Sequence, residues 1–337
     1  MENGIYIYGI IKTSSPKEFG EIGIDDKAAS NVLTIGYKNI AAVVSNSPLM
    51  VYDSLAKEKV VKDLATHQFV IEKVMQSFTI VPVKFGTMVE TEDEVIKFLE
   101  NGYVLLSDEL SKIEGKIELD VVAWWELPKI LAALSRHNSQ IQEKQQKLAL
   151  KGEKVSIEDK IMLGQCIEQA LKAEKARYYE LILQTLKQGT EDVSLHDVAT
   201  DKMILNAAFL LAKKNEEIFQ AIVHDLDQTL ENTVNFRVVG PLPLYSFSTI
   251  LFKRIDPDSI EKAKKTLGLT GGITDKTLRD TYHQLAKEYH PDKSSGEVSM
   301  EFQHIHAAYT TLKNLIENGL IHTEVYRWKK DDSRRKL

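Results

Sequence analysis

The chain has 337 residues, 43% of them hydrophobic and 27% charged, with a formal net charge of −6. This length predicts two or three domains, and the hydrophobic content is enough for sizeable cores. The acidic balance argues against the whole chain being a nucleic-acid binder. The single cysteine, Cys166, excludes an intrachain disulfide and fits a reducing cytoplasm. No signal peptide is recognisable, and no apolar run approaches the roughly 18–20 residues of a membrane span.

The first 125 residues alternate between strand and helix patterns. Runs rich in β-forming residues predict strands, and apolar residues at three- and four-residue spacing predict helices. Residues 14–23, interrupted by Gly and Pro, are interpreted as a polar connection. A sheet with helices on one side predicts a two-layer α+β domain of ferredoxin-like type. The expected strands are 5–11, 31–35, 40–45, 80–85 and 116–125, and the expected helices are 54–78, 92–100 and 103–113.

The next part of the chain begins with a region almost free of strand signals. Two long helices rich in Glu, Lys, Gln and Leu predict an antiparallel hairpin. Strand signals then return and indicate a second, smaller α+β domain. Pro241 and Pro243 cannot lie within a central strand, so an extended loop or a sheet edge is expected there. The expected helices are 141–150, 157–186 and 215–232, and the expected strands are 193–198, 203–211 and 234–239.

Motifs of catalysis and of metal or cofactor binding are missing from the sequence. It contains no GxGxxG, GxxxxGK[ST], HExxH or CxxC pattern. His67 is the most tempting catalytic candidate, but a lone histidine on a helix is more often a packed or hydrogen-bonded residue. The sequence therefore predicts no catalytic residue, no metal and no cofactor, and it predicts that the protein is not an enzyme.

Two helices with facing apolar stripes are expected on either side of the tripeptide His290-Pro291-Asp292. Pro291 ends the first helix because it has no N–H to donate and crowds the preceding turn. Two such stripes joined by a short polar loop predict an antiparallel helical hairpin. Basic side chains line the opposite side of the first helix. The apolar stripes are Leu278, Tyr282, Leu285 and Tyr289, then Phe302, Ile305, Tyr309, Leu312 and Ile316; the basic residues are Lys276, Arg279, His283 and Lys287.

This arrangement resembles a J domain, the module of DnaJ-type co-chaperones. The matching patterns are YxxLAxxY at 282–289, HPDK at 290–293 and FxxIxxAYxxL at 302–312, preceded by Leu267-Gly268-Leu269. The resemblance implies that the HPD loop and the basic helix face bind a DnaK-type chaperone and stimulate its ATPase. A hairpin kept for packing or self-association, with a merely solvated basic face, is the alternative. The implied chaperone-binding residues are His290, Pro291, Asp292, Arg279, Lys287 and Lys293.

The main body shows a second resemblance, which four landmarks carry. They are IYIYGI at 5–10, His67 on a long helix leading to IVPVKFGT at 80–87, NAAFL at 206–210 and FRVVGPLPLYSF at 236–247. Over residues 4–255 the chain resembles the GvpF/GvpL family of gas-vesicle proteins. The resemblance implies a two-domain α/β fold with ferredoxin-like sheets. It also implies a non-enzymatic minor vesicle protein that contacts the small hydrophobic shell protein and other vesicle accessory proteins.

The predicted domains follow from these two resemblances and from composition. An α+β domain of ferredoxin-like type is expected over 1–127, and the helical hairpin with the second α+β domain over 128–255. The J-like module is expected over 258–318, and residues 319–337 are interpreted as a basic, mobile tail.

The two resemblances together suggest a gas-vesicle assembly factor in the cytoplasm. Its body would bind shell subunits, and its J-like module would bring a DnaK-type chaperone to them; no nucleic-acid partner is expected. One alternative is a purely structural vesicle component whose hairpin is a protein–protein interaction element. The other is a general co-chaperone that binds unfolded proteins of many kinds.

Overall fold

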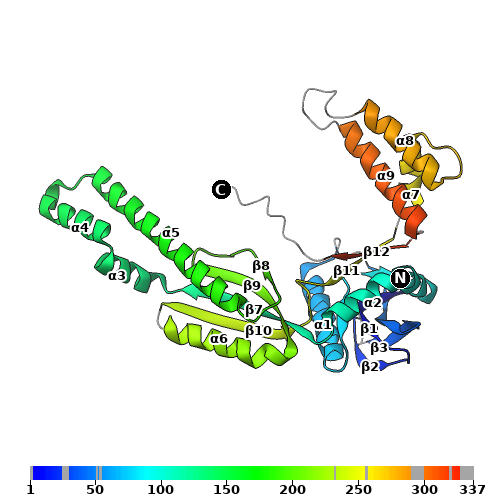
Figure 1. Ribbon diagram of the computed structural model, residues 1–337, viewed down its shortest axis with the longest axis horizontal. Helices are drawn as coiled ribbons and strands as arrows, with labels where there is room; N and C mark the ends of the chain where they lie inside the picture. The colour runs from blue at the N-terminus through cyan, green and yellow to red at the C-terminus, as the bar shows by residue number, and fades with distance from the viewer. Residues whose placement is uncertain are drawn as a thin grey trace. The chain divides into compact units, whose positions relative to one another are not determined.

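The computed structural model describes residues 3–24, 30–50, 52, 55–230, 233–254, 257–289, 300–318 and 321–326. The chain divides into two units (Figure 1). The first unit contains Met1–Glu114 and Ser248–Arg327, and the second is built mainly from Gly115–Phe247. Within the described ranges, every helix is too short or too polar to span a lipid bilayer.

An antiparallel sheet of six strands forms the centre of the first unit. Its strands follow the order β2-β3-β4-β1-β5, and β6 also pairs with β1. Residues 4–11 of β1 are all buried, and because neighbouring residues of a strand face opposite sides, both faces of the sheet are covered there. The strands are β1 (Asn3–Lys12), β2 (Glu18–Gly23), β3 (Ser30–Tyr37), β4 (Ile40–Pro48), β5 (Ile80–Pro82) and β6 (Met88–Val89), and the helices are α1 (Lys57–Met75) and α2 (Glu92–Ile113).

The second unit contains an antiparallel sheet of four strands in the order β10-β7-β9-β8. Alternate residues of β7 and β9 form a core with α5 and α6, which lie against one face of this sheet (Figure 1). The strands are β7 (Lys116–Trp125), β8 (Asp192–Leu195), β9 (Met203–Ala212) and β10 (Val234–Leu242). The helices are α3 (Leu127–His137), α4 (Ser139–Lys151), α5 (Ile157–Lys187) and α6 (Glu216–Thr229), with short 3₁₀ turns η2 (Gly152–Lys154) and η3 (Lys213–Asn215).

Local sequence explains where the long helices begin. The Thr91 side chain accepts a hydrogen bond from the Glu94 N–H, and three acidic residues occupy the first turn of α2. Ser156 and Asp159 form a reciprocal capping box at the start of α5. Each cap pairs backbone N–H groups that a helix start otherwise leaves without partners.

Three helices follow the second unit in the chain and pack around their own core. They are α7 (Pro257–Leu267), α8 (Asp275–Glu288) and α9 (Met300–Asn318). Strand β11 (Thr249–Arg254) precedes them and strand β12 (Ile321–Tyr326) follows them, and these two strands pair antiparallel. The buried core residues of the helices are Ile260, Ala263, Leu267, Leu278, Ile305, Ala308 and Leu312.

The α+β class, the two sheets, the α4–α5 pair and the C-terminal helices are confirmed. Strand β10 is an edge strand with an irregular register between Val239 and Leu242, as its prolines predicted. The ferredoxin-like part of the fold prediction is not confirmed, because four strands precede the first helix. The sheet was expected to be covered on one side only, whereas β1 is buried on both of its faces.

Four details of the sequence interpretation are wrong. Residues 14–23, expected as a connection, contain strand β2. The two helices expected at 92–100 and 103–113 are one helix, α2, because the buried Gly102 continues it. Strand β7, assigned to the first sheet, lies inside the second. The expected tail at 319–337 contains β12, which pairs with β11.

Candidate functional site

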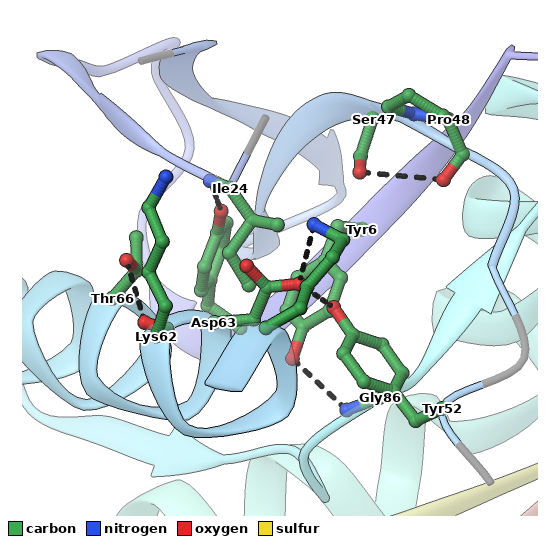
Figure 2. A network of polar contacts seen from close by, with 11 residues as sticks. Tyr6, Ile24, Ser47, Pro48, Tyr52, Lys62, Asp63, Thr66 and Gly86 are labelled. Carbon is green, nitrogen blue, oxygen red and sulfur yellow. Dashed lines mark hydrogen bonds and ion pairs between the residues drawn. The ribbon is translucent and has the colours of Figure 1, made fainter. Parts of the chain in front are cut away.

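The segment Ile80–Thr87, one of the family landmarks, is fastened to the central strand β1 through Tyr6. The Tyr6 hydroxyl accepts a hydrogen bond from the Gly86 N–H at 2.9 Å (Figure 2). The same oxygen lies 3.0 Å from Nδ1 of His67. Tyr6 and His67 therefore share one hydrogen bond, whose direction is set by the tautomer of the imidazole. Gly86 has a φ of +83°, a backbone conformation that glycine adopts without strain.

His67 lies among aromatic rings and is only 2% exposed. It stacks on Tyr8 with centroids 5.8 Å apart, and it meets Tyr6 and Phe85 edge-on at 5.7 Å and 5.6 Å. Burial lowers the pKa of His67 to about 4, so the ring is neutral at physiological pH. The packed, hydrogen-bonded role expected for this histidine is confirmed. Tyr6, Tyr8 and His67 are called the tyrosine–histidine cluster below.

Further polar contacts surround the tyrosine–histidine cluster. The Tyr8 hydroxyl accepts from the Ile24 N–H at 2.7 Å and lies 2.8 Å from the Ser45 hydroxyl. Burial raises the pKa of both tyrosines, that of Tyr8 to about 12, so both phenols keep their protons. On α1, the buried Asp63 accepts from the Tyr52 hydroxyl at 3.1 Å (Figure 2) and pairs with Lys59 at 3.1 Å. The cluster is thus a buried hydrogen-bond network that joins β1, α1 and the landmark segment.

The second landmark, FRVVGPLPLYSF, is fastened to the central strand of the other sheet. Both the N–H and the hydroxyl of Ser246 donate to the carboxyl group of Glu118 on β7, at 2.9 Å and 2.8 Å. Glu118 is 1% exposed. Gly240 precedes a cis peptide bond to Pro241 and has a φ of +142°. A Cβ at Gly240 would come within 2.9 Å of the Glu118 carbonyl oxygen, so only glycine allows this close approach.

A second carboxyl group lies next to Glu118. Burial raises the pKa of Glu118 to about 8, and the neighbouring Asp120 carboxyl raises it further. The pKa of Asp120 is also raised by burial, although His196 opposes the shift. His196 Nε2 lies 3.4 Å from the Ser246 hydroxyl. Glu118, Asp120 and Ser246, called the carboxyl cluster below, therefore hold a proton at neutral pH.

The C-terminal helices build the module whose signature the sequence contains. Tyr282 of α8 stacks on Tyr309 of α9 with centroids 4.1 Å apart, and its hydroxyl lies 3.0 Å from Nδ1 of His306. Leu278 and Leu312 are fully buried between the helices. The predicted facing of the two stripes is confirmed for these residues, whereas Tyr289 is 39% exposed. Signature residues thus form the core that α7, α8 and α9 share.

The outer face of α8 is only partly as predicted. Arg279 and Lys287 are exposed there, as expected. Arg279, however, pairs with Asp275 at 2.8 Å, and Lys287 lines an open hollow together with two acidic residues, Asp280 and Glu288. The face therefore carries mixed charge. The predicted residues His290, Pro291, Asp292 and Lys293 lie outside the described residues.

Sequence reasoning did not find Glu118, Asp120 or Tyr6 as parts of a cluster. The sequence predicted a strand at 116–125, but it did not show that Ser246 covers Glu118. Across the part of the chain that the structure describes, no three His, Cys, Asp or Glu side chains are arranged to hold a metal ion.

Two antiparallel α+β units, each with a landmark segment bound to its central strand, and a three-helix J-type module define the class of protein. Residues 4–249 match the family described as "Gas vesicle synthesis protein GvpL/GvpF", and residues 265–316 match the DnaJ domain. Gas vesicle protein F of Nostoc sp. is 27% identical over 256 residues, which cover 74% of this chain and all of that protein. Gas vesicle protein F of Dolichospermum flosaquae is 26% identical over 252 residues, 73% of this chain and 98% of that protein.

The crystal structure of the gas vesicle protein GvpF from Anabaena sp. is similar to this structure, with a TM-score of 0.60 and 25% identity. The likeness covers 73% of this chain and 98% of that one. The chain therefore belongs to the GvpL/GvpF family of gas vesicle synthesis proteins, and it carries a DnaJ domain near its C-terminus.

Proposed function

We propose that this protein is a non-enzymatic assembly factor of the gas vesicle. Its GvpL/GvpF body binds the small hydrophobic shell protein and other vesicle accessory proteins, and its DnaJ domain brings a DnaK-type chaperone to them. A shell subunit that lines a gas space must expose apolar surface before it is incorporated, and such surface drives non-specific association. A chaperone held beside the subunit would keep it available for assembly at the vesicle.

One observation carries the chaperone part of the proposal. The signature residues Leu278, Tyr282 and Tyr309 form a packed three-helix core, and the exposed Arg279 and Lys287 lie on the outer face of α8. We assign the chaperone contact to His290, Pro291, Asp292, Arg279, Lys287 and Lys293. Because acidic residues share the outer face, we expect the charged contacts to affect mainly the association rate.

Chaperone ATPase stimulation by the full chain tests this assignment. We expect wild-type protein to stimulate the ATPase of a DnaK-type chaperone and His290→Gln to lose the stimulation. The matched control is His304→Gln, which makes the same change at an exposed position of α9 and should keep wild-type stimulation. Equal stimulation by the His290→Gln variant, or none by any of the three proteins, removes the co-chaperone role.

Light scattering of the shell protein tests whether chaperone recruitment keeps this protein from aggregating. With chaperone and ATP present, the wild-type chain should suppress shell-protein aggregation more than His290→Gln does. Two alternatives make different predictions. A purely structural vesicle component would bind vesicle proteins without any chaperone, and Asp292→Asn would not disturb that binding. A general co-chaperone would suppress aggregation of unrelated unfolded proteins equally well.

A further inference from the structure

Two strands that flank the DnaJ domain are paired with one another. The ladder joins all six residues of β11 to all six of β12, from Thr249 opposite Tyr326 to Arg254 opposite Ile321. The paired strands β11 and β12 are called the ribbon below. The family match ends at residue 249 and the DnaJ match spans 265–316, so neither match includes the ribbon beyond Thr249. Only residues 255–256 separate β11 from α7, and only residues 319–320 separate α9 from β12.

The other edge of β11 is bound to the first unit's landmark segment. Ile250 forms a parallel bridge with Val83, and its carbonyl accepts from the Lys84 N–H at 2.8 Å. The N–H and C=O of one strand residue point to the same side, so those of Ile250 point away from β12. The backbone N–H and C=O groups of its neighbours Thr249 and Leu251 consequently point toward β12.

This alternation assigns the hydrogen bonds of the ribbon. Leu251 lies opposite Glu324, so these two residues exchange N–H···O=C bonds. Phe252 lies opposite Thr323, and the backbone groups of this pair point outward from the ribbon. The edge of β11 that faces β12 therefore presents the N–H groups of Leu251 and Lys253 to a partner strand.

We propose that this edge of β11 is a strand-binding site, that the chain fills it with its own β12, and that the DnaJ domain is thereby attached to the body at both of its ends. The ligand class is an extended peptide added antiparallel to an exposed strand. The site depends on neither the chaperone nor the shell protein, so it goes beyond the function proposed above.

The paired strands β11 and β12 join the module at the start of α7 and at the end of α9. Helix α9 has 19 residues and is about 28 Å long at 1.5 Å per residue. Its C-terminal end leads directly into β12, whereas its N-terminal end, at Met300, follows residues 290–299 in the chain. In the chain, the HPD tripeptide lies between the C-terminal end of α8 and the N-terminal end of α9. Strand β12 follows the opposite, C-terminal end of α9.

Residue-resolved hydrogen exchange on two full-length proline variants tests the proposal. Proline removes an N–H, and Glu324 uses this group toward β11 whereas Thr323 does not. We expect Glu324→Pro to speed exchange at the Leu251 and Lys253 amides by at least about 100-fold, because they lose their partner strand. The amide of Ile250, which faces Val83, should keep its protection. Thr323→Pro is the matched control and should leave all three amides protected.

A peptide of residues 319–328 provides the second test. It should bind Glu324→Pro and restore protection at Leu251 and Lys253, yet not bind wild-type protein, whose site is filled. The same peptide with proline at position 324 should not bind either protein. Equal exchange in both proline variants, binding to neither protein, or equal binding to wild type would overturn the proposal. Loss of protection in β1 as well would also overturn it, because β12 would then be part of the core and not an attachment.

Discussion

The tyrosine–histidine cluster and the carboxyl cluster do the same structural task with opposite chemistry. Each lies on a central strand, β1 or β7, and each holds one landmark segment through a backbone N–H: that of Gly86 on the Tyr6 hydroxyl, and that of Ser246 on the Glu118 carboxyl. The first cluster depends on a base that stays unprotonated. The second depends on an acid that stays protonated.

The two landmark segments share a backbone feature despite this chemical difference. Both segments contain a glycine with positive φ, Gly86 or Gly240, and both turn back to reach a buried polar atom. A buried polar group without a partner costs about 1–3 kcal/mol, so each segment and its acceptor stabilise one another. We infer that these landmarks are retained for packing, since neither cluster exposes a reactive group.

Removal of His67 should have the largest effect on this comparison. His67→Ala leaves a cavity between the rings of Tyr6, Tyr8 and Phe85, and it takes away the hydrogen-bond partner that the Tyr6 hydroxyl has in His67. We expect the free energy of unfolding to fall by about 4 kcal/mol. Urea unfolding measures the change. Gln68→Ala, at the exposed neighbouring position of α1, should change it by less than about 0.5 kcal/mol. A loss as small as that of the control would mean that the cluster does not hold the segment.

The pH dependence of stability separates the two clusters. The pKa of His67 falls from 6.5 to about 4 on folding, so the unfolded chain binds the proton more readily. Stability from this group is complete above pH 6.5 and decreases on acidification toward pH 4, by about 3 kcal/mol. The pKa of Glu118 rises from 4.5 to about 8, so its contribution is complete below pH 4.5 and decreases as the pH rises toward 8.

Urea unfolding between pH 4 and pH 8 measures both slopes. Glu118→Gln keeps a carbonyl acceptor and cannot ionise, so its stability should no longer decrease toward pH 8. Its decrease toward pH 4 should remain, because His67 is unchanged. A wild-type curve that already rises toward pH 8, with the same shape in the variant, would contradict the buried proton of the carboxyl cluster.

Much of the fold followed from the sequence because its signals are local. Strand and helix periodicity located most elements, and spacing alone grouped Leu278, Tyr282 and Tyr309 into one core. What remained hidden depends on distant partners. Glu118 alternates like a solvent-facing residue of β7, and only Ser246, 128 positions away, covers it. Strand β12 is short and stands next to a basic tail, and its partner β11 lies about 70 residues earlier in the chain.

The two landmark glycines should differ in their tolerance of a side chain. Alanine at Gly240 would place its Cβ 2.6 Å from Leu119 Cδ2 and 2.9 Å from the Glu118 carbonyl oxygen, which belongs to the sheet and cannot move aside. Alanine at Gly86 would meet the Tyr52 ring at 3.1 Å. We expect losses of about 3 kcal/mol for Gly240→Ala and about 1–2 kcal/mol for Gly86→Ala.

Gly164→Ala on α5 is the matched control for both glycine variants. Apart from its chain neighbours and the nearby backbone of the helix itself, no atom lies within 4 Å of the added Cβ. Alanine is also the better helix former, so stability should rise by about 0.5–1 kcal/mol. The measurement is the urea midpoint of the three variants. Equal losses at Gly240 and Gly86 would show that backbone conformation, and not the close approach to β7, sets the requirement.

The smallest effect on stability is expected at two surface arginines, one in each unit. Arg279 pairs with Asp275 and Arg177 with Glu174, and the two arginine side chains are 57% and 58% exposed. Either change to alanine should lower the free energy of unfolding by only a few tenths of a kcal/mol, because exposed ion pairs contribute little. Stopped-flow association with a DnaK-type chaperone should nevertheless distinguish them. Arg279→Ala should slow association, most clearly at low salt, and Arg177→Ala should not. Equal association rates would show that the outer face of α8 is merely solvated.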